Sequence, residues 1–333
     1  MQFYYRGLFG FTRVFKNTMQ ALWMVAGAFF FATMGVFVKY ASASFTTAEI
    51  VFYRGLIGMA VLWWLARRQG IGLATRHPWM HGWRSLVGVT AMSGWFYAIT
   101  KMPLATGMTF NYMSSLWIAA FLVAGALWTW RPGHTGARRS LNIPLLATIV
   151  MGFVGVLLLL QPSFAQQQGV AALAGLSSGV LSAMAYMQVS ALSRAGEPEA
   201  RTVFYFCLGC AVGGGAVMLG GGVSPWPGIG PSLWLLPVGV LAAGGQLCMT
   251  RAYATAQTPR ATLVVANLQY TGLIFASAYS LVWFDDQINL LGWLGMALVA
   301  ASGIAATVLR ARNKVAPPAT AETEAPMASP AGR

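Results

Sequence analysis

The stretch IPLLATIVMGFVGVLLLL, residues 143–160, runs without a single charged side chain. Its residues do not alternate between apolar and polar, as they would in a strand of a membrane β-barrel. A transmembrane helix needs about 20 mostly apolar residues to cross about 30 Å of hydrocarbon. The stretch therefore predicts an α-helix that spans a membrane.

Other segments of the chain share this length and composition, and together they predict an all-α membrane protein with ten transmembrane helices. Short loops join the segments, so we expect no further folded domain. The predicted helices cover residues 20–40, 48–66, 84–101, 106–128, 143–160, 170–192, 202–220, 233–253, 260–284 and 289–309.

The two tails differ in composition. The N-terminal arm, residues 1–19, lacks the apolar core and cleavage site of a signal peptide. Aromatic residues alternate with basic ones in this arm, which predicts either an interfacial segment or a flexible cytoplasmic tail. Residues 311–333 are rich in Pro, Ala, Thr and Glu, and we expect a disordered cytoplasmic tail.

The overall composition excludes several classes of protein. Of the 333 residues, 57% are hydrophobic and only 8% are charged, whereas soluble domains carry about 25% charged residues. A soluble enzyme, a disordered protein and a disulfide-rich secreted domain are therefore excluded. Three cysteines in apolar surroundings, Cys207, Cys210 and Cys248, predict neither a disulfide framework nor a metal cluster.

The net charge of +14 reflects how the chain is oriented in the membrane. With the N-terminus inside, 18 of the 21 Lys and Arg residues fall on the cytoplasmic side, and Arg67, Arg68, Arg76 and Arg84 lie in or beside one such loop. The positive-inside rule then predicts cytoplasmic N- and C-termini, an even number of helices and the inner membrane of a bacterium. Because the basic residues are spread over many loops, we expect no nucleic-acid partner.

An internal repeat divides the chain into a first half, residues 20–161, and a second half, residues 170–310. Four similarities recur in the same order, 148–156 residues apart. Five helices in each half would make the second half enter the membrane from the opposite side, which is the inverted repeat of many secondary transporters. The matching positions are Val51-Phe52-Tyr53 with Val203-Phe204-Tyr205, Lys101 with Arg251, Asn111 with Asn267, and Gly155-Val156 with Gly303-Ile304.

Several of these motifs resemble the EamA-type repeats of the drug/metabolite transporter superfamily. The resemblance covers about residues 20–310, and it implies a ten-helix carrier that moves a small metabolite by alternating access. The first half lacks the acidic residue that such repeats often carry after their fourth helix. The motifs are Phe52-Tyr-Arg54-Gly, Met102-Pro-Leu-Ala105, Gly152-Phe-Val-Gly155-Val, Arg251-Ala-Tyr-Ala-Thr-Ala-Gln, Asn267-Leu-Gln-Tyr270, Asp285-Asp286 and Leu298-Val-Ala-Ala-Ser-Gly303.

Arg54 is the charged residue that lies farthest inside a predicted helix. A charge near the middle of a transmembrane helix costs about 2.5–3.5 kcal/mol on insertion scales, and such residues usually face a cavity or a partner. Arg54 either anchors an anionic group of a solute or has a structural role, paired with Glu49 or with carbonyl groups near the outer surface. Lys39 and Glu49 flank the first outer loop, and we expect them to form an interfacial pair.

Polar residues at helical spacing complete the candidate site. Asn111, Ser114 and Ser115 share one helix face, and Asn267, Tyr270 and Thr271 repeat that spacing in the second half. These side chains face either a solute pocket or a neighbouring helix, since hydrogen bonds between helices also explain intramembrane polarity. The candidate substrate-binding residues are Arg54, Trp95, Asn111, Ser115, Tyr186, Gln246, Asn267 and Tyr270.

Glycines at small-xxx-small spacing predict close helix packing, at Gly175 with Gly179 and at Gly209 with Gly213. Cys207 and Cys210 have a metal-like spacing, but they lie within an apolar helix and are interpreted as packing residues. All three histidines are assigned to cytoplasmic loops. No catalytic set is recognised, so we predict no enzymatic activity, no catalytic residue, no metal and no cofactor.

The sequence thus predicts a secondary transporter that moves a small amphipathic metabolite, an amino acid or a related compound, across the cytoplasmic membrane. Its expected partners are the lipid bilayer and this solute. The alternative is a structural or accessory membrane protein that transports nothing. Substrate identity, direction of transport, ion coupling and oligomeric state are left open, a monomer included.

Overall fold

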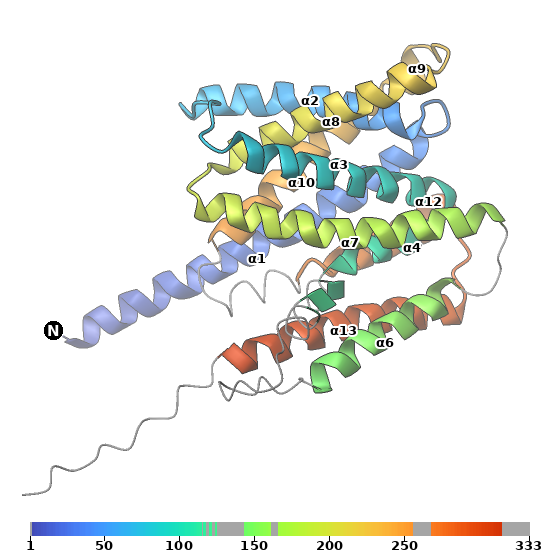
Figure 1. The fold of residues 1–333 in the computed structure, drawn as a ribbon. Coiled ribbons are helices and arrows are strands. Elements are labelled where there is room, and N and C mark those ends of the chain that lie inside the picture. The colour runs from blue at the N-terminus through green and yellow to red at the C-terminus, as the bar shows by residue number, and fades with distance from the viewer. Residues whose placement is uncertain are drawn as a thin grey trace, which may run out of the picture.

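The computed structural model describes residues 2–114, 116–117, 120–121, 124, 143–160, 166–255 and 268–314, the first 17 of these by their backbone alone. Every regular element within these residues is a helix (Figure 1). The helices are α1 (Gln2–Ala41), α2 (Thr47–Arg68), α3 (Pro78–Lys101), α4 (Leu104–Tyr112), α6 (Ile143–Leu160), α7 (Gln166–Arg194), α8 (Glu199–Gly221), α9 (Ile229–Ser232), α10 (Leu235–Thr255), α12 (Thr271–Phe284) and α13 (Leu290–Lys314).

Five helices in the described part of the chain are long and apolar enough to cross a membrane, and two shorter apolar helices accompany them. The predicted all-helical membrane fold is therefore confirmed. The ten-helix count stays a prediction, because parts of two expected helices, residues 106–128 and 260–284, lie outside the described residues. The five are Met19–Ala41, Thr47–Arg68, Gly169–Arg194, Glu199–Gly221 and Ile229–Thr255, and the shorter two are Thr271–Phe284 and Leu290–Ala305.

Most observed helix bounds agree with the expected ones, and α6 coincides with the expected helix at residues 143–160. Two helices begin clearly earlier than expected: α1 starts at Gln2, so that the expected arm continues the first helix, and α3 begins at Pro78 rather than at residue 84. Proline suits the first turn of a helix, because it lacks only an N–H group that would have no partner there. The earlier start places His81 and Arg84 within α3, where both are buried. The assignment of His81 to a loop was therefore wrong, and Arg84, expected at the start of this helix, lies almost two turns inside it.

Glu49 closes the N-terminus of α2 and also reaches the second half of the chain. Thr46 and Glu49 form a capping box, in which the Thr46 N–H donates to Oε2 of Glu49 at 2.6 Å. The backbone N–H of Ser224 donates to Oε1 of the same carboxylate at 2.8 Å. Lys39 instead forms an ion pair with Asp286 at 3.2 Å. The expected pair of Lys39 with Glu49 was therefore wrong, because each residue has a nearer partner on the second half.

Each long helix of the first half packs against a helix of the second half. The contacting pairs are α1 with α10, α2 with α8, α3 with α7, α4 with α12, and α6 with α13. Figure 1 shows α2 and α8 side by side, and α6 beside α13. The core therefore lies between the halves, and not within either one.

Glycines permit this close packing, as the sequence predicted. A Cβ at Gly179 would lie 2.5 Å from the carbonyl oxygen of Phe110 on α4, and one at Gly209 would lie 2.5 Å from Cβ of Ser85 on α3. Gly55 lies equally close to the backbone of α8, where its Cβ would be 2.5 Å from the Ala211 nitrogen. A larger residue at these positions would push the two halves apart.

Candidate functional site

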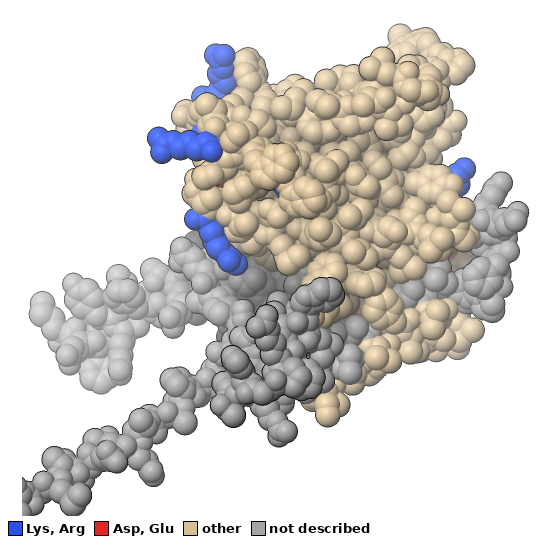
Figure 2. All heavy atoms as spheres, viewed as in Figure 1, with Lys and Arg blue, Asp and Glu red and all other residues tan. Residues whose placement is uncertain are grey.

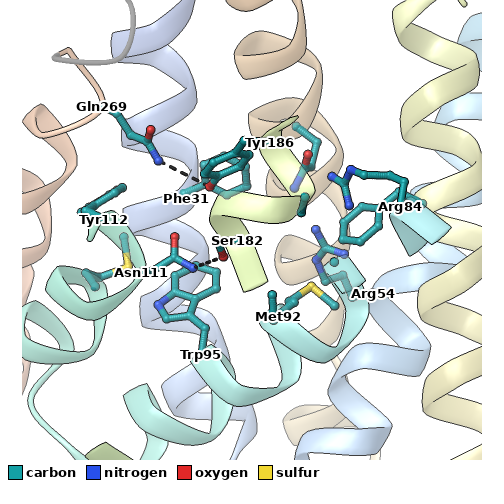
Figure 3. Close-up of a pocket in the computed structure, with 16 residues that line it drawn as sticks. Phe31, Arg54, Arg84, Met92, Trp95, Asn111, Tyr112, Ser182, Tyr186 and Gln269 are labelled. Carbon is teal, nitrogen blue, oxygen red and sulfur yellow. Dashed lines mark hydrogen bonds between the residues drawn. The ribbon is translucent and has the colours of Figure 1, made fainter. Parts of the chain in front are cut away.

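A small pocket lies where the helices of the two halves meet (Figure 3). Its volume is about 50 Å³, which is room for a few water molecules. Residues of α1, α2, α3 and α4 line it from the first half, and residues of α7, α8 and α10, together with Gln269, line it from the second half. The lining residues include Phe31, Arg54, Arg84, Gly88, Trp95, Asn111, Tyr112, Ser182, Tyr186, Phe206, Gln246 and Gln269.

Five of the eight candidate residues line this pocket, namely Arg54, Trp95, Asn111, Tyr186 and Gln246. Tyr270 lies behind the pocket wall, where its ring contacts that of Tyr112 with 6.4 Å between the centroids. Ser115 and Asn267 lie outside the described residues. The structure thus gathers residues that are far apart in the sequence, while their part in binding stays a prediction.

Arg54 is only 2% exposed, and its nearest polar contact is a thiol. Its Nη1 donates to Sγ of Cys210 on α8 at 3.2 Å. Glu49 bonds to Thr46 and Ser224, so the structural pair that the sequence allowed between Arg54 and Glu49 is replaced by this contact. The guanidinium carbon lies 5.3 Å from the centre of the Phe206 ring. Nε of Arg54 has no partner among the described residues.

Arg84 is the second arginine of the pocket, and the sequence analysis missed it. It lies on α3, is 3% exposed, and its guanidinium carbon is 4.2 Å from the centre of the same Phe206 ring. Its Nε and Nη1 have no partner among the described residues. Cation–π contacts of this kind stabilise a desolvated guanidinium by about 2 kcal/mol, but they do not balance its charge.

Gly88 makes room for the side chain of Arg84. It lies four residues later on the same face of α3, and a Cβ at this position would clash with Nη1 of Arg84. The same Cβ would come within 2.9 Å of the Phe206 ring. Two features of the sequence could have indicated that Arg84 is buried. Pro78 can begin a helix, and Gly88 follows Arg84 by four residues on the same helix face.

The other end of the pocket carries amides, hydroxyls and aromatic rings (Figure 3). Nδ2 of Asn111 donates to Oγ of Ser182 at 3.1 Å, which joins α4 to α7. Asn111 therefore both lines the pocket and bonds to a neighbouring helix, so both interpretations of this residue apply. Nε1 of Trp95 and Oη of Tyr112 have no partner within the described chain.

The described residues that line the pocket include no aspartate and no glutamate. Two guanidinium groups therefore share one buried site without a carboxylate among those residues. Figure 3 shows both arginines at the same end of the pocket, with Asn111 and Tyr112 at the other. The arrangement can attract negative charge at one end and exchange hydrogen bonds at the other.

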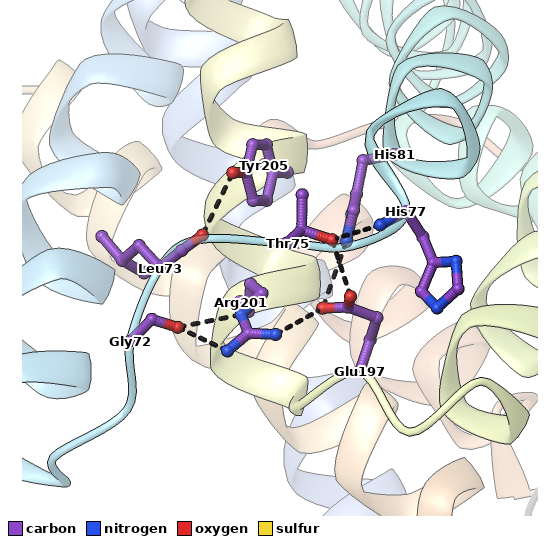
Figure 4. Close-up of polar contacts among 8 residues, drawn as sticks. All are labelled: Gly72, Leu73, Thr75, His77, His81, Glu197, Arg201 and Tyr205. Atoms are coloured by element: carbon purple, nitrogen blue, oxygen red, sulfur yellow. Dashed lines mark hydrogen bonds and ion pairs between the residues drawn. The ribbon is translucent and has the colours of Figure 1, made fainter.

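A second polar group, which we term the Glu197 cluster, consists of Thr75, His81, Glu197 and Arg201 (Figure 4). Oε2 of Glu197 lies 3.0 Å from Nη1 of Arg201 and 3.4 Å from Nε2 of His81. Thr75 donates to Oε1 at 2.6 Å. Glu197 lies between α7 and α8, whereas Thr75 lies between α2 and α3, so the cluster joins the two halves.

Further hydrogen bonds secure the α2–α3 loop to α8. Nε and Nη2 of Arg201 donate to the Gly72 carbonyl at 2.9 and 2.6 Å, and the Tyr205 hydroxyl donates to the Leu73 carbonyl at 3.0 Å. Burial raises the pKa of Glu197, but the hydrogen bonds from Thr75 and Arg201 outweigh it and leave this pKa below its usual value. Glu197 is therefore a fully partnered carboxylate.

Comparison with known proteins places the chain beside bacterial transporters. It is 29% identical over 286 residues to the pseudopaline exporter CntI of Pseudomonas aeruginosa, covering 84% of this chain and 93% of the exporter. It is 27% identical over 283 residues to an uncharacterized transporter of Helicobacter pylori, covering 82% of this chain and 89% of that protein. The chain is similar to transporters along most of its length.

A solved crystal structure shares the fold. It matches 88% of this chain and 98% of its own, with a TM-score of 0.61 and 20% sequence identity. No protein-family model matches the sequence. The relatives therefore support membrane transport as the general activity, and the fold agrees with a helical membrane protein.

Proposed function

We propose that this protein is a secondary transporter, which carries a small solute across the bacterial inner membrane by alternating access. The observation that carries the proposal is the pocket, which residues of both halves line in a chain similar to transporters. The proposed solutes are amino acids and related amphipathic metabolites. Their carboxylate suits the arginines, and their apolar part suits Trp95 and Phe206.

The pairing of helices supports an EamA-type inverted repeat of five helices in each half. In such a repeat each helix of the first half has a counterpart in the second. The counterparts are α1 and α7, α2 and α8, α3 and α10, α4 and α12, and α6 and α13. The observed contacts α2–α8, α4–α12 and α6–α13 are unchanged when counterparts are exchanged, while α1–α10 and α3–α7 replace each other. A pseudo-two-fold axis in the membrane plane predicts this pattern.

Contacts at both ends of the bundle support alternating access. At one end the Glu197 cluster joins the α2–α3 loop to the link between α7 and α8. At the other end Lys39 pairs with Asp286, and Glu49 bonds to Ser224. A pocket of about 50 Å³ is too small for a metabolite, so binding requires helices to move apart. Opening one end at a time would expose the pocket to one side of the membrane.

Surface charge supports the proposed orientation. On the face in Figure 2 most exposed Lys and Arg residues lie at the end of the bundle that carries the α2–α3 loop. Arg67, Arg68, Arg76 and Arg194 are exposed at this end. The positive-inside rule assigns such an end to the cytoplasm.

A non-transporting accessory protein is the competing proposal, and the hydrogen bonds of Asn111 fit it equally well. An accessory protein has no use for two buried arginines whose charge is unbalanced, because burying an ion is costly. The arginines therefore favour a solute site.

Reconstitution decides between the two proposals. Purified protein in proteoliposomes is tested with amino acids and nucleoside-type metabolites, and flux is read as solute uptake or as current on a solid-supported membrane. We expect flux of at least one solute, and its loss in Asn111→Ala with normal expression and melting temperature. Absence of flux for every solute, in a preparation that melts cooperatively, would contradict transport.

A further inference from the structure

Arg54 and Arg84 form an unusual pair, because they bring two positive charges into one buried pocket. We propose that this pair binds a small organic solute with two negative charges close together, carried by two carboxylates a few atoms apart or by one phosphate. The proposal rests on the proposed function, since it names the solute class of the same pocket. It narrows the proposed amphipathic metabolites to those that carry two negative charges.

The position of the two guanidinium groups is the first argument. Both lie on the ring of Phe206, with carbon-to-centroid distances of 5.3 and 4.2 Å. Like charges this close repel each other strongly in a site shielded from water. Cys210, which accepts a hydrogen bond from Arg54, is a free cysteine, and its neutral thiol does not balance the charge. One negative charge would neutralise half of the pair, and two would neutralise it.

The free donors of the two arginines are the second argument. Nε of Arg54 and both Nε and Nη1 of Arg84 are buried without a partner among the described residues. A guanidinium binds carboxylate and phosphate oxygens through two parallel N–H donors, which gives strong and geometrically specific contacts. The vacant donors of Arg84 include Nε, which belongs to such a fork. An anionic solute would satisfy donors that the described chain leaves unsatisfied.

Arg201 is an arginine with a structural role, and its partners can be compared with those of the pocket arginines. Its guanidinium pairs with the Glu197 carboxylate at 3.0 Å and donates twice to the Gly72 carbonyl. Arg201 and the two pocket arginines thus differ in partners, although Arg201 and Phe206 lie on the same helix. The charge of Arg201 is thus balanced within the chain, whereas an anionic ligand would balance the charges of the pocket arginines.

The far end of the pocket limits the rest of the solute. The described lining contains no carboxylate that could hold an ammonium group. Nε1 of Trp95 and Oη of Tyr112 are free there, and the indole N–H can only donate. Beyond its charged head, the solute should therefore carry a hydrogen-bond acceptor and need no amino group.

Matched ligand pairs test the proposal on the full chain, purified in detergent in a buffer without chloride or phosphate. Succinate is compared with succinamate and succinamide, which lack one and both charges, and glycerol 3-phosphate is compared with glycerol. The readouts are titration calorimetry and melting temperature, since a ligand that binds the folded state raises the latter. We expect a dianion to bind at least about tenfold more tightly than its singly charged or neutral partner.

The dicarboxylate series and the phosphate ester pair show which chemical group carries the two charges. Preference for succinate over succinamate assigns a dicarboxylate, and preference for glycerol 3-phosphate over glycerol assigns a phosphate ester. Equal affinity within both pairs would overturn the proposal. Stabilisation by chloride alone, as large as that by either dianion, would overturn it as well.

Variants then connect the preference to the arginines. Arg84→Gln and Arg54→Gln should each reduce the preference for the dianion about tenfold, while Arg84→Lys retains part of it. Arg76→Gln is the matched control, because Arg76 is exposed on the same side of the protein and should leave the preference unchanged. If Arg84→Gln keeps the full preference, the assignment to Arg84 is wrong. If a variant fails to fold, the ligand pairs on the unaltered chain still decide.

Flux measurements separate this inference from the proposed function. Binding of a dianion without transport of any solute would support the dianion site and contradict the proposed transport function. Transport of solutes regardless of their charge would retain the transporter and contradict the dianion site. The two proposals therefore fail on different observations.

Discussion

Two polar regions built on the same helices, α3 and α8, differ in how their charges are balanced. In the Glu197 cluster one carboxylate is surrounded by Thr75, His81 and Arg201. In the pocket, about one and a half helical turns from Arg201 along α8, two guanidiniums share the Phe206 ring without a carboxylate in the described lining. The charge of Arg201 thus has a carboxylate partner within the described chain, and the charges of the two pocket arginines do not.

The difference shows where this protein uses its few acidic residues. The chain has 7 Asp and Glu residues against 21 Lys and Arg residues. Glu197, Glu49 and Asp286 each join the first half of the chain to the second. Acidic residues therefore stabilise contacts between the halves at the two ends of the bundle, whereas the pocket between these ends depends on negative charge from a solute.

Removal of the Glu197 carboxylate should have the largest effect on stability. Glu197→Gln keeps an acceptor oxygen but removes the negative charge that pairs with Arg201, and breaking an ion pair that is largely buried costs up to about 3 kcal/mol. We expect a clear fall in the melting temperature of the purified protein. Glu199→Gln, two residues later and without a hydrogen bond among the described residues, is the control and should have little effect. Equal melting temperatures for both variants would show that the Glu197 cluster does not stabilise the contact between the two halves.

Acidification should weaken the same cluster to a smaller extent. The pKa of Glu197 lies below its usual value of 4.5 in the folded protein, so the carboxylate contributes stability above that pH. This contribution should decline as the pH falls below 4.5 and disappear below the folded-state pKa. Melting temperatures measured between pH 7 and pH 3 should converge for the unaltered protein and Glu197→Gln. Parallel curves would contradict the assignment to this carboxyl.

A methyl group at Gly88 should impair the pocket without removing a charge. In Gly88→Ala the new Cβ clashes with the Arg84 guanidinium and displaces it from its place beside Phe206. We expect about tenfold weaker dianion binding, which corresponds to about 1.4 kcal/mol. Gly82→Ala on the same helix is the control, since a Cβ there meets no atom within 4 Å. Titration calorimetry with succinate or glycerol 3-phosphate measures both variants, and unchanged affinity in Gly88→Ala would show that Arg84 does not hold the ligand.

Neutralisation of Arg84 should have the smallest effect on stability, in contrast to Glu197. Arg84→Gln removes a buried charge that has no counter-charge among the described residues, so the free energy of unfolding should stay the same or rise by up to about 1 kcal/mol. Thermal unfolding without ligand measures this. A loss of stability as large as that of Glu197→Gln would mean that Arg84 has a structural role, and the contrast between the two regions would no longer hold.

Much of the architecture could be predicted from the sequence, because membrane helices follow from local hydropathy. The bounds of α6 match the expected segment, and Gly179 and Gly209 make the close helix contacts that their spacing predicts. Polar residues at helical spacing also identified much of the pocket, including Asn111 and Tyr186. Such residues can be found without a structure, since an intramembrane polar group must face a cavity or a partner.

The partners of the charged residues could not be predicted in this way. Lys39 binds Asp286 and not Glu49, and Glu49 binds Ser224. These pairs join positions that lie far apart in the chain, so they depend on which helices pack together. The lining residue Gln269 was missed for the same reason, because its position depends on its contact with Tyr186 of α7, 83 residues earlier in the chain.

The sequence by itself determined that the chain is a helical membrane protein with few charges, because composition and hydropathy act locally. Only the tertiary structure decided which of those charges meet. The sequence placed Arg84 at the start of a helix, beside a cytoplasmic loop, whereas in the structure α3 begins at Pro78 and brings Arg84 against Phe206 of α8. Burial of a side chain depends on its neighbours in space, and for Arg84 those neighbours come from the other half of the protein.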